Sequence, residues 1–331
     1  MPRKATIFDV AKRADVPVDL VEKIIRGEAD VEHEVQLKVL RAVHELHYHP
    51  EFYEERSNSI ALMAPFFYAP FVSEIVDGIE KSLVGTEFNA GQYSTKGVLE
   101  NERHIFEKLI RWNLADAFVL FNIPVDDDVR EELKQLKTPV VSIESEIPGF
   151  TCITTDNYSG GYKGTEYLLR GGRKNIAIVI GRRYNMDPVQ NDRIKGYMQA
   201  LTDNGLEFQD DAIFVVNEHV LDEGREIFYS INKAEPAFDA VFCMAGDVVA
   251  TGIISAAKKA KVKIPDDLAI IGYDDLAMSG FLDPPLTTIK QPARKMGEAA
   301  IKIITEGLRQ GEYKNPGKII FESELIVRSI A

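Results

Sequence analysis

The stretch TIFDVAKRADVPVDLVEKII, residues 6–25, decides how this chain begins to fold. Thr6 stands three residues before Asp9, which is the spacing of a capping box at the start of a helix. A short turn at Asp15 follows. Pro17 suits the first turn of a second helix, because the N–H that proline lacks has no partner there. The sequence therefore predicts two short helices joined by a tight turn.

Apolar residues at helical spacing predict a third helix after this pair. They are Val35, Val39, Val43 and Leu46, which lie on one face of a helix. Three short helices with a tight turn between the first two form a helix-turn-helix, whose second helix normally enters the major groove of DNA. We therefore predict a helix-turn-helix headpiece over residues 1–50 and a linker over residues 51–59.

Four parts of the headpiece resemble the lactose/galactose-repressor family. They are DVAKRA at residues 9–14, Val16, Val31 and ELHYHP at residues 45–50. The resemblance implies a bacterial transcription regulator, dimeric or tetrameric, that binds operator DNA and responds to a small effector, usually a sugar. It also implies a two-lobed body of the kind found in periplasmic binding proteins.

The resemblance places the DNA contacts on and around the second helix. The candidate DNA-binding residues are Thr6, Val18, Asp19, Lys23 and Arg26. Val18 can touch a thymine methyl group, Asp19 can accept a hydrogen bond from cytosine, and Lys23 can donate one to guanine.

Charge distinguishes this headpiece from one that binds DNA strongly. Residues 1–50 hold eight Lys and Arg against nine Asp and Glu, in a chain of net charge −13. Glu22 and Glu32 stand where the resemblance predicts Ser or Thr for phosphate contacts. The linker is short and lacks the Leu that relatives wedge into the minor groove. Two hypotheses stay open: a repressor with weakened or altered operator recognition, and a small-molecule sensor whose headpiece has lost operator binding.

From Ile60 onward, short apolar strands alternate with amphipathic helices, a pattern typical of parallel α/β sheets. Strands are predicted at residues 60–64, 88–93, 117–121, 140–143, 176–180, 212–216, 240–244, 268–271, 319–324 and 325–328. Helices are predicted at residues 71–83, 100–112, 128–136, 158–170, 191–204, 222–231, 248–261 and 293–307. We expect residues 60–157 and 287–316 to form lobe 1, and residues 158–286 and 317–331 to form lobe 2.

Polar residues at strand ends are candidates for the ligand site, because ligands of open α/β sheets bind outside the carboxyl ends of the strands. Asp156, Arg193 and Asp274 match positions that bind sugar hydroxyls in the family, where a forked guanidinium and carboxylates suit a polyol. Asp156 and Asp274 can instead cap helices. Gly246 stands where sugar-binding relatives place Asn or Ser, so Asp247 becomes a candidate, unless it too is a helix cap.

Four aromatic residues follow the first body strand: Phe66, Phe67, Tyr68 and Phe71, of which Tyr68 and Phe71 are the two selected as candidates. Aromatic rings can cover the apolar face of a sugar, so both are candidate ligand residues, although core packing explains them about equally well. The helix at residues 71–83 has one apolar side. The corresponding helix packs in the dimer interface of relatives, which predicts a homodimer, and the alternative is burial against its own sheet.

Other features of the chain argue against catalysis, cofactors and membranes. The sequence contains no G-x-G-x-x-G after a strand and no P-loop, so we expect no enzyme, no catalytic residue and no cofactor. The histidines of residues 44–49 are interpreted as a solvated face or a helix-end interaction, not a metal site. Two distant cysteines, and the lack of a secretory segment or a long apolar run, predict a cytoplasmic protein. An exported solute-binding protein is disfavoured.

Overall fold

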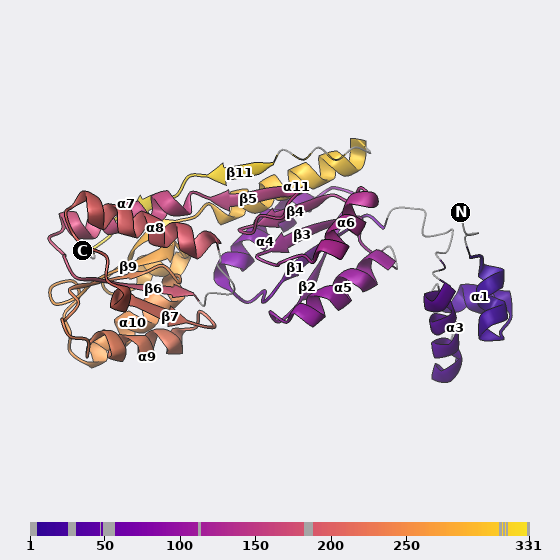
Figure 1. Ribbon diagram of the computed structural model, residues 1–331, viewed down its shortest axis with the longest axis horizontal. Coiled ribbons are helices and arrows are strands. Elements are labelled where there is room, and N and C mark those ends of the chain that lie inside the picture. The colour runs from indigo at the N-terminus through magenta and orange to yellow at the C-terminus, as the bar shows by residue number, and fades with distance from the viewer. Residues whose placement is uncertain are drawn as a thin grey trace.

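The computed structural model describes residues 5–25, 31–46, 48, 57–111, 114–181, 188–310, 313, 315 and 317–329. It has an N-terminal headpiece of helices and a body of two α/β lobes (Figure 1). The lobe that contains the first body strand is called the N-lobe, and the other the C-lobe. Within these ranges, no helix is long and apolar enough to cross a membrane.

Three helices form the headpiece, as predicted: α1 (Ile7–Ala14), α2 (Val18–Ile25) and α3 (His33–Leu46). Their apolar faces meet in a small core. Val10 and Val39 are 0% exposed within it. Because the core draws on all three helices, it fixes the angle at which α2 is presented.

The predicted capping box at the start of α1 is confirmed. The backbone N–H of Asp9 donates to Thr6 Oγ1 at 3.4 Å, and the Asp9 carboxylate accepts from the Thr6 backbone N–H at 2.8 Å. Pro17 differs from expectation. It precedes α2, and its carbonyl accepts hydrogen bonds from Leu20 and Val21. Proline thus ends the turn without entering the helix.

The N-lobe is a six-stranded parallel sheet in the order β11-β5-β4-β3-β1-β2. Its strands are β1 (Ser59–Ala64), β2 (Asn89–Ser94), β3 (Ala117–Phe121), β4 (Val140–Ile143), β5 (Thr151–Thr155) and β11 (Lys318–Phe321). Helices α4 (Pro70–Leu83) and α11 (Ala293–Gln310) cover one face. Helices α5 (Leu99–Arg111) and α6 (Asp127–Gln135) cover the other.

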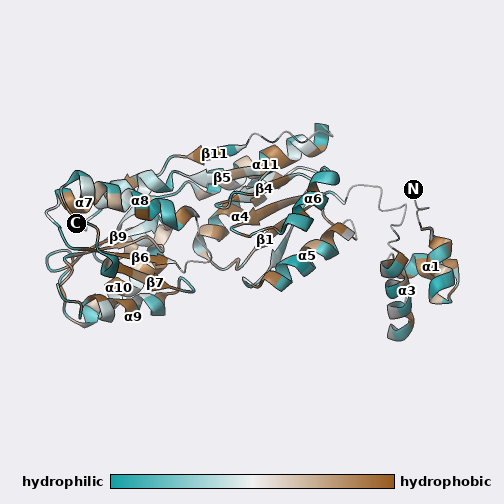
Figure 2. Cartoon of the chain, in the orientation of Figure 1, coloured by the Kyte–Doolittle hydropathy of each residue, from teal (hydrophilic) through white to brown (hydrophobic). Residues whose placement is uncertain are grey.

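The C-lobe repeats this plan in the order β12-β10-β9-β8-β6-β7, with only β12 antiparallel. Its strands are β6 (Ile176–Gly181), β7 (Ile213–Val216), β8 (Ala240–Cys243), β9 (Ala269–Asp274), β10 (Thr287–Lys290) and β12 (Glu324–Ile326). Helices α7 (Asn157–Arg170) and α8 (Pro188–Asp203) cover one face, and α9 (Leu221–Ile231) and α10 (Asp247–Lys259) the other. Figure 2 shows the apolar strands enclosed by helices with polar outer faces.

The chain crosses between the two sheets at three places. These crossovers are residues 155–157 between β5 and α7, residues 290–293 between β10 and α11, and residues 321–324 between β11 and β12. The first and third lie side by side, because the Asp156 N–H donates to the Phe321 carbonyl at 2.8 Å and the Ser323 hydroxyl donates to the Asp156 carbonyl at 3.0 Å. This bundle of crossovers is the hinge between the lobes.

The predicted lobe boundaries were wrong at two segments. β10, at residues 287–290, belongs to the C-lobe sheet, and β11, at residues 318–321, belongs to the N-lobe sheet. β5, which the sequence analysis did not predict, pairs with β11. Both errors have one physical cause: short strands are assigned to a sheet by their hydrogen-bonding neighbours, which the local sequence does not encode.

The apolar side of the helix at residues 71–83 faces its own lobe. Ile75 and Ile79 of α4 are 1% and 0% exposed, and both pack in the core that α4 shares with α11. Burial against its own sheet, the alternative left open by the sequence, accounts for this apolar side. The pattern therefore gives no separate support to a dimer interface.

Helices α7 and α8 pack closely at Gly161. A Cβ atom on Gly161 would stand 2.1 Å from the Arg193 carbonyl oxygen, a backbone atom that cannot turn aside. We expect Gly161→Ala to lower the free energy of unfolding by about 1–3 kcal/mol, measured by urea denaturation. Gly280→Ala is the matched control, because its nearest neighbour would be Arg328 Nε at 3.7 Å. Equal losses in the two variants would contradict the close approach.

Candidate ligand site between the lobes

Left-handed backbone conformations mark the carboxyl ends of the strands. Glu144 after β4 has φ 63°, and Asp274 at the end of β9 has φ 109°. Gly246 after β8 has φ 110°. Such conformations cost free energy for residues other than glycine, and they cluster at functional sites. The carboxyl ends of the strands next to the hinge therefore form the candidate site.

Arg193 of α8 is the centre of this site, and it is 6% exposed. Its Nε donates to Asn157 Oδ1 at 2.8 Å, its Nη1 to the Met244 carbonyl at 2.7 Å, and its Nη2 to Gln291 Oε1 at 3.4 Å. The guanidinium also lies 3.7 Å from the centre of the Tyr273 ring. This cation is held by neutral oxygens and an aromatic face.

Two amide side chains connect Arg193 to two carboxylates. Asn157 Nδ2 donates to Glu144 Oε2 at 3.2 Å, and Gln291 Nε2 donates to Asp274 Oδ1 at 2.7 Å. Each amide therefore accepts from the guanidinium through its oxygen and donates to a carboxylate through its nitrogen. Glu144 belongs to the N-lobe and Asp274 to the C-lobe, so the network spans the hinge.

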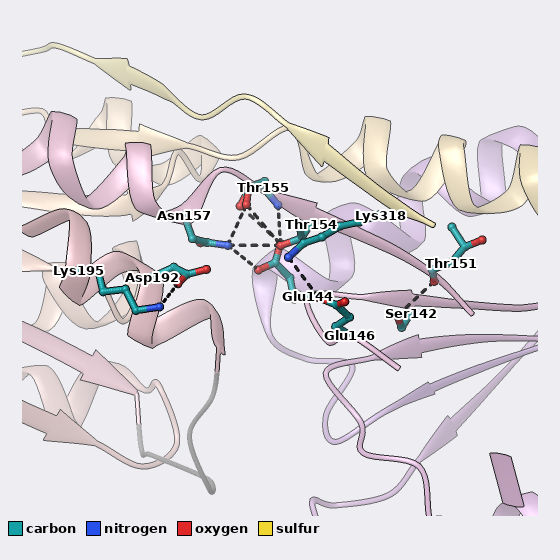
Figure 3. Close-up of polar contacts among 10 residues, drawn as sticks. All are labelled: Ser142, Glu144, Glu146, Thr151, Thr154, Thr155, Asn157, Asp192, Lys195 and Lys318. Carbon is teal, nitrogen blue, oxygen red and sulfur yellow. Dashed lines mark hydrogen bonds and ion pairs between the residues drawn. The ribbon is translucent and has the colours of Figure 1, made fainter. Parts of the chain in front are cut away.

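Glu144 is buried at the end of β4, with partners on the first crossover (Figure 3). Its Oε1 accepts from the Thr155 backbone N–H at 3.1 Å and from the Thr154 hydroxyl at 3.3 Å. Burial raises the pKa of Glu144, and the charge of Arg193 opposes that rise. The carboxylate is bonded to the segment that joins the lobes, so a change in the hinge would change its hydrogen bonds.

Asp274 is half-buried, and its environment disfavours the charged form. Burial raises its pKa to about 7, the Asp247 charge raises it further, and Arg193 and the Gln291 hydrogen bond act in the opposite direction. The group therefore changes charge near neutral pH, so small changes around it shift its protonation.

Asp247, a predicted ligand residue, has a structural role in the C-lobe. It is 0% exposed, and its carboxylate accepts from Ser279 Oγ at 2.5 Å, Thr288 Oγ1 at 2.7 Å and the Leu276 N–H at 2.9 Å. Burial raises its pKa to about 6. These partners all lie in the C-lobe, so Asp247 holds the loop after β9 and is not available to a ligand.

Asp156 serves as the N-cap of α7. Its Oδ1 accepts from the Ser159 N–H at 2.8 Å, which is the capping role considered from the sequence. Asp156 lies on the first crossover next to Asn157. It therefore positions the start of the helix that carries Asn157 into the network.

The two predicted aromatic residues have different surroundings. Tyr68 is 64% exposed, with its ring 5.2 Å from that of Phe66. Phe71 packs against the apolar core of the N-lobe. The structure thus brings Arg193 and Asp274 together, while Phe71 fits the packing alternative.

Sequence reasoning missed Glu144, Asn157 and Gln291. Glu144 directly follows a predicted strand, and Gln291 lies in the segment that returns to the first lobe, so strand-end position was the available signal for both. His219 was missed as well. Its φ is 57°, and its Nδ1 lies 2.8 Å from the Ala245 carbonyl oxygen, beside β8.

The predicted DNA-contacting residues fall on two helices of the headpiece. Asp19 and Lys23 are exposed on α2, whereas Val18 is half-buried against the headpiece core. Thr6 caps α1. Arg26 and the side chains of the headpiece histidines lie outside the described residues, and no metal-binding cluster occurs among those that are described.

The chain is similar to helix-turn-helix transcription regulators over nearly its whole length. It is 30% identical over 335 residues to the HTH-type transcriptional regulator DegA of Bacillus subtilis (strain 168), and the match covers 98% of this chain and 97% of DegA. The chain belongs to the lactose/galactose-repressor (LacI) family. The resemblance predicted from the headpiece motifs is thereby confirmed.

Further similarities agree with this family. The chain is 29% identical over 343 residues to the HTH-type transcriptional repressor PurR of Vibrio parahaemolyticus serotype O3:K6, with 98% of each chain covered. Residues 165–329 match the family described as periplasmic binding protein-like domain. A solved complex of the transcriptional regulator CelR with cellobiose superposes with a TM-score of 0.73 at 25% identity, covering 99% of this LacI-family chain and 100% of CelR.

The raised pKa of Asp274 predicts how stability depends on pH. The pKa is higher in the folded chain than its ordinary value of 3.8, so the folded protein binds this proton more tightly than the unfolded chain. That stabilisation is complete below about pH 4 and is lost as the pH rises through about 7. We expect Asp274→Asn to reduce the loss of unfolding free energy between about pH 5 and pH 8 by on the order of 1–3 kcal/mol.

Urea denaturation at several pH values measures this effect. Asp192→Asn is the control, because Asp192 forms a surface ion pair with Lys195 at 2.8 Å. An unchanged pH dependence in Asp274→Asn would show that Asp274 does not titrate near neutral pH.

Proposed function

We propose that this protein is a repressor whose headpiece binds operator DNA and whose hinge site binds a small polar effector, a carbohydrate, in the cytoplasm. The observation that carries this proposal is the network from Glu144 through Arg193 to Asp274, because it joins both lobes through buried polar groups. A carbohydrate suits such a site, since its hydroxyls both donate and accept hydrogen bonds. The relative CelR was solved with cellobiose.

Effector binding would act through the crossovers. Gln291 lies on the second crossover, and its Oε1 accepts from Thr155 Oγ1 of the first crossover at 2.8 Å. A ligand that bonds to Asp274 alters the hydrogen bond that Gln291 donates to this carboxylate and thereby changes the contacts that set the lobe angle. A lobe angle that differs between free and bound states is the coupling that an allosteric regulator requires.

The headpiece would read DNA through α2 and through the start of α1. Lys23 is the exposed cation on α2, and Asp19 is an exposed carboxylate on the same helix. Arg13 on α1 forms an ion pair with Glu45 on α3, which reduces its attraction for phosphate. Binding then depends on few phosphate contacts, so it should be sensitive to single changes.

A homodimer is part of the proposal, because headpieces of this class read paired half-sites. An exposed aromatic residue supports it: Phe281 of the C-lobe is 90% exposed. A closed two-fold pair can cover such a residue on both copies.

The alternative function is a small-molecule sensor whose headpiece has lost operator binding. The exposed Asp19 and the Arg13–Glu45 ion pair favour it. Selection from random oligonucleotides by the full-length protein at low salt separates the two functions. Enrichment of a palindromic site supports the repressor, and enrichment no better than that of a protein lacking residues 1–56 supports the sensor.

Lys23 provides the sharper test of DNA binding. We expect Lys23→Ala to weaken binding to the selected site at least about tenfold, because a base contact contributes about 1–3 kcal/mol. Fluorescence anisotropy with labelled duplex measures the dissociation constant. Lys38→Ala is the control, since Lys38 on α3 pairs with Glu34 at 3.3 Å. Equal effects of the two substitutions would remove α2 as the reading helix.

A further inference from the structure

The carboxylates around the hinge site do not all have a cation of their own. Asp275 forms ion pairs with Arg328 at 2.6 Å and Lys290 at 3.8 Å, and Glu146 forms one with Lys318 at 3.3 Å. Figure 3 shows the pair of Glu146 and Lys318 beside Glu144. Ordinary surface acids here are thus neutralised individually.

Asp274 and Glu144 differ from these neighbours. Among the described residues, neither has a salt bridge, and each receives an amide N–H from Gln291 or Asn157. Arg193 is the cation whose charge acts on both acids, and it donates only to neutral oxygens. Two acids therefore share one positive charge at a distance, and Asp247 adds a third acid whose charge acts on Asp274. When these acids are ionised, the site is negative.

One oxygen of Asp274 is left open to a ligand. Oδ1 is held by Gln291, and among the described residues no donor bonds to Oδ2. Oδ2 faces Gly246, where a Cβ atom would stand 2.9 Å away. A Cβ at this position would crowd Oδ2, so with glycine the backbone lies directly against an acceptor that has no donor among the described residues.

We propose that the effector of this site is an aminated polyol, such as an amino sugar, whose ammonium group pairs with Asp274 Oδ2. The inference rests on the proposed function, whose effector it specifies. An ammonium group supplies both the missing donor and the missing positive charge. A neutral hydroxyl supplies only the donor, and an anionic ligand meets repulsion from Asp274, Glu144 and Asp247. The electrostatic balance of the site selects the amine.

Matched ligands test this inference. Isothermal titration calorimetry at about pH 7 compares glucosamine, galactosamine and mannosamine with their parent sugars and their N-acetyl derivatives. We expect at least one amine to bind about tenfold or more tightly than both of its neutral counterparts. This preference should disappear at about pH 5.5, where Asp274 is protonated. If no matched set shows an amine preference at neutral pH, the proposal is overturned.

Two variants locate the effect. Asp274→Asn should abolish the amine preference, because the amide keeps the shape and loses the charge. Glu146→Gln, which removes an acid paired with Lys318, should retain it. Thermal melting confirms that each variant is folded. The pH comparison on the unaltered chain tests the role of the carboxylate charges without any substitution, and Asp274→Asn assigns the effect to Asp274. A preference that survives in Asp274→Asn would refute the assigned partner.

Failure of the inference and failure of the proposed function give different results. If a neutral sugar binds as tightly as its amine and shifts operator affinity, the function stands and the amine proposal falls. If the amine binds with the expected preference but leaves DNA affinity unchanged, the amine proposal stands and effector control falls. Both arms use the full chain with the operator obtained by selection.

Discussion

A single buried cation organises the region between the lobes. Arg193 stacks on Tyr273 and donates to Asn157 and Gln291, and these amides hold one carboxylate from each lobe. A buried charge without partners would be very costly, so every member of this network constrains the others. The lobes can therefore change their relative angle only by rearranging these bonds, which makes the network a natural point of control.

The same physics explains why the site favours particular ligands. Burial raises the pKa of Asp274 to about 7, the amides bond to both acids without neutralising them, and Asp274 Oδ2 faces Gly246. In the headpiece, acidic residues outnumber the basic residues that could bind phosphate. One of those basic residues, Arg13, is already paired with Glu45. In this acidic chain, specificity depends both on the cations that are present and on the sites, such as Asp274, where an acid has no cation paired with it.

The sequence predicted much of the fold because the signals were local. The capping box at Thr6, the helical spacing of Val35, Val39 and Val43, and the alternation of strands and helices each depend on neighbouring residues. The errors were non-local. Strands β10 and β11 were placed in the wrong lobes because sheet membership depends on pairing with strands that the local sequence does not specify, and β11 pairs with β5 across more than a hundred residues.

For the site, the sequence by itself determined that Asp274 stands at the end of a strand, that Arg193 belongs to a helix, and that position 246 has no side chain. Only the tertiary structure decided that Asp247 is enclosed by Ser279 and Thr288, and that Glu144 joins the network. The physical reason is that residue type sets what a side chain can donate or accept, whereas burial and the partners brought by distant segments set what it does.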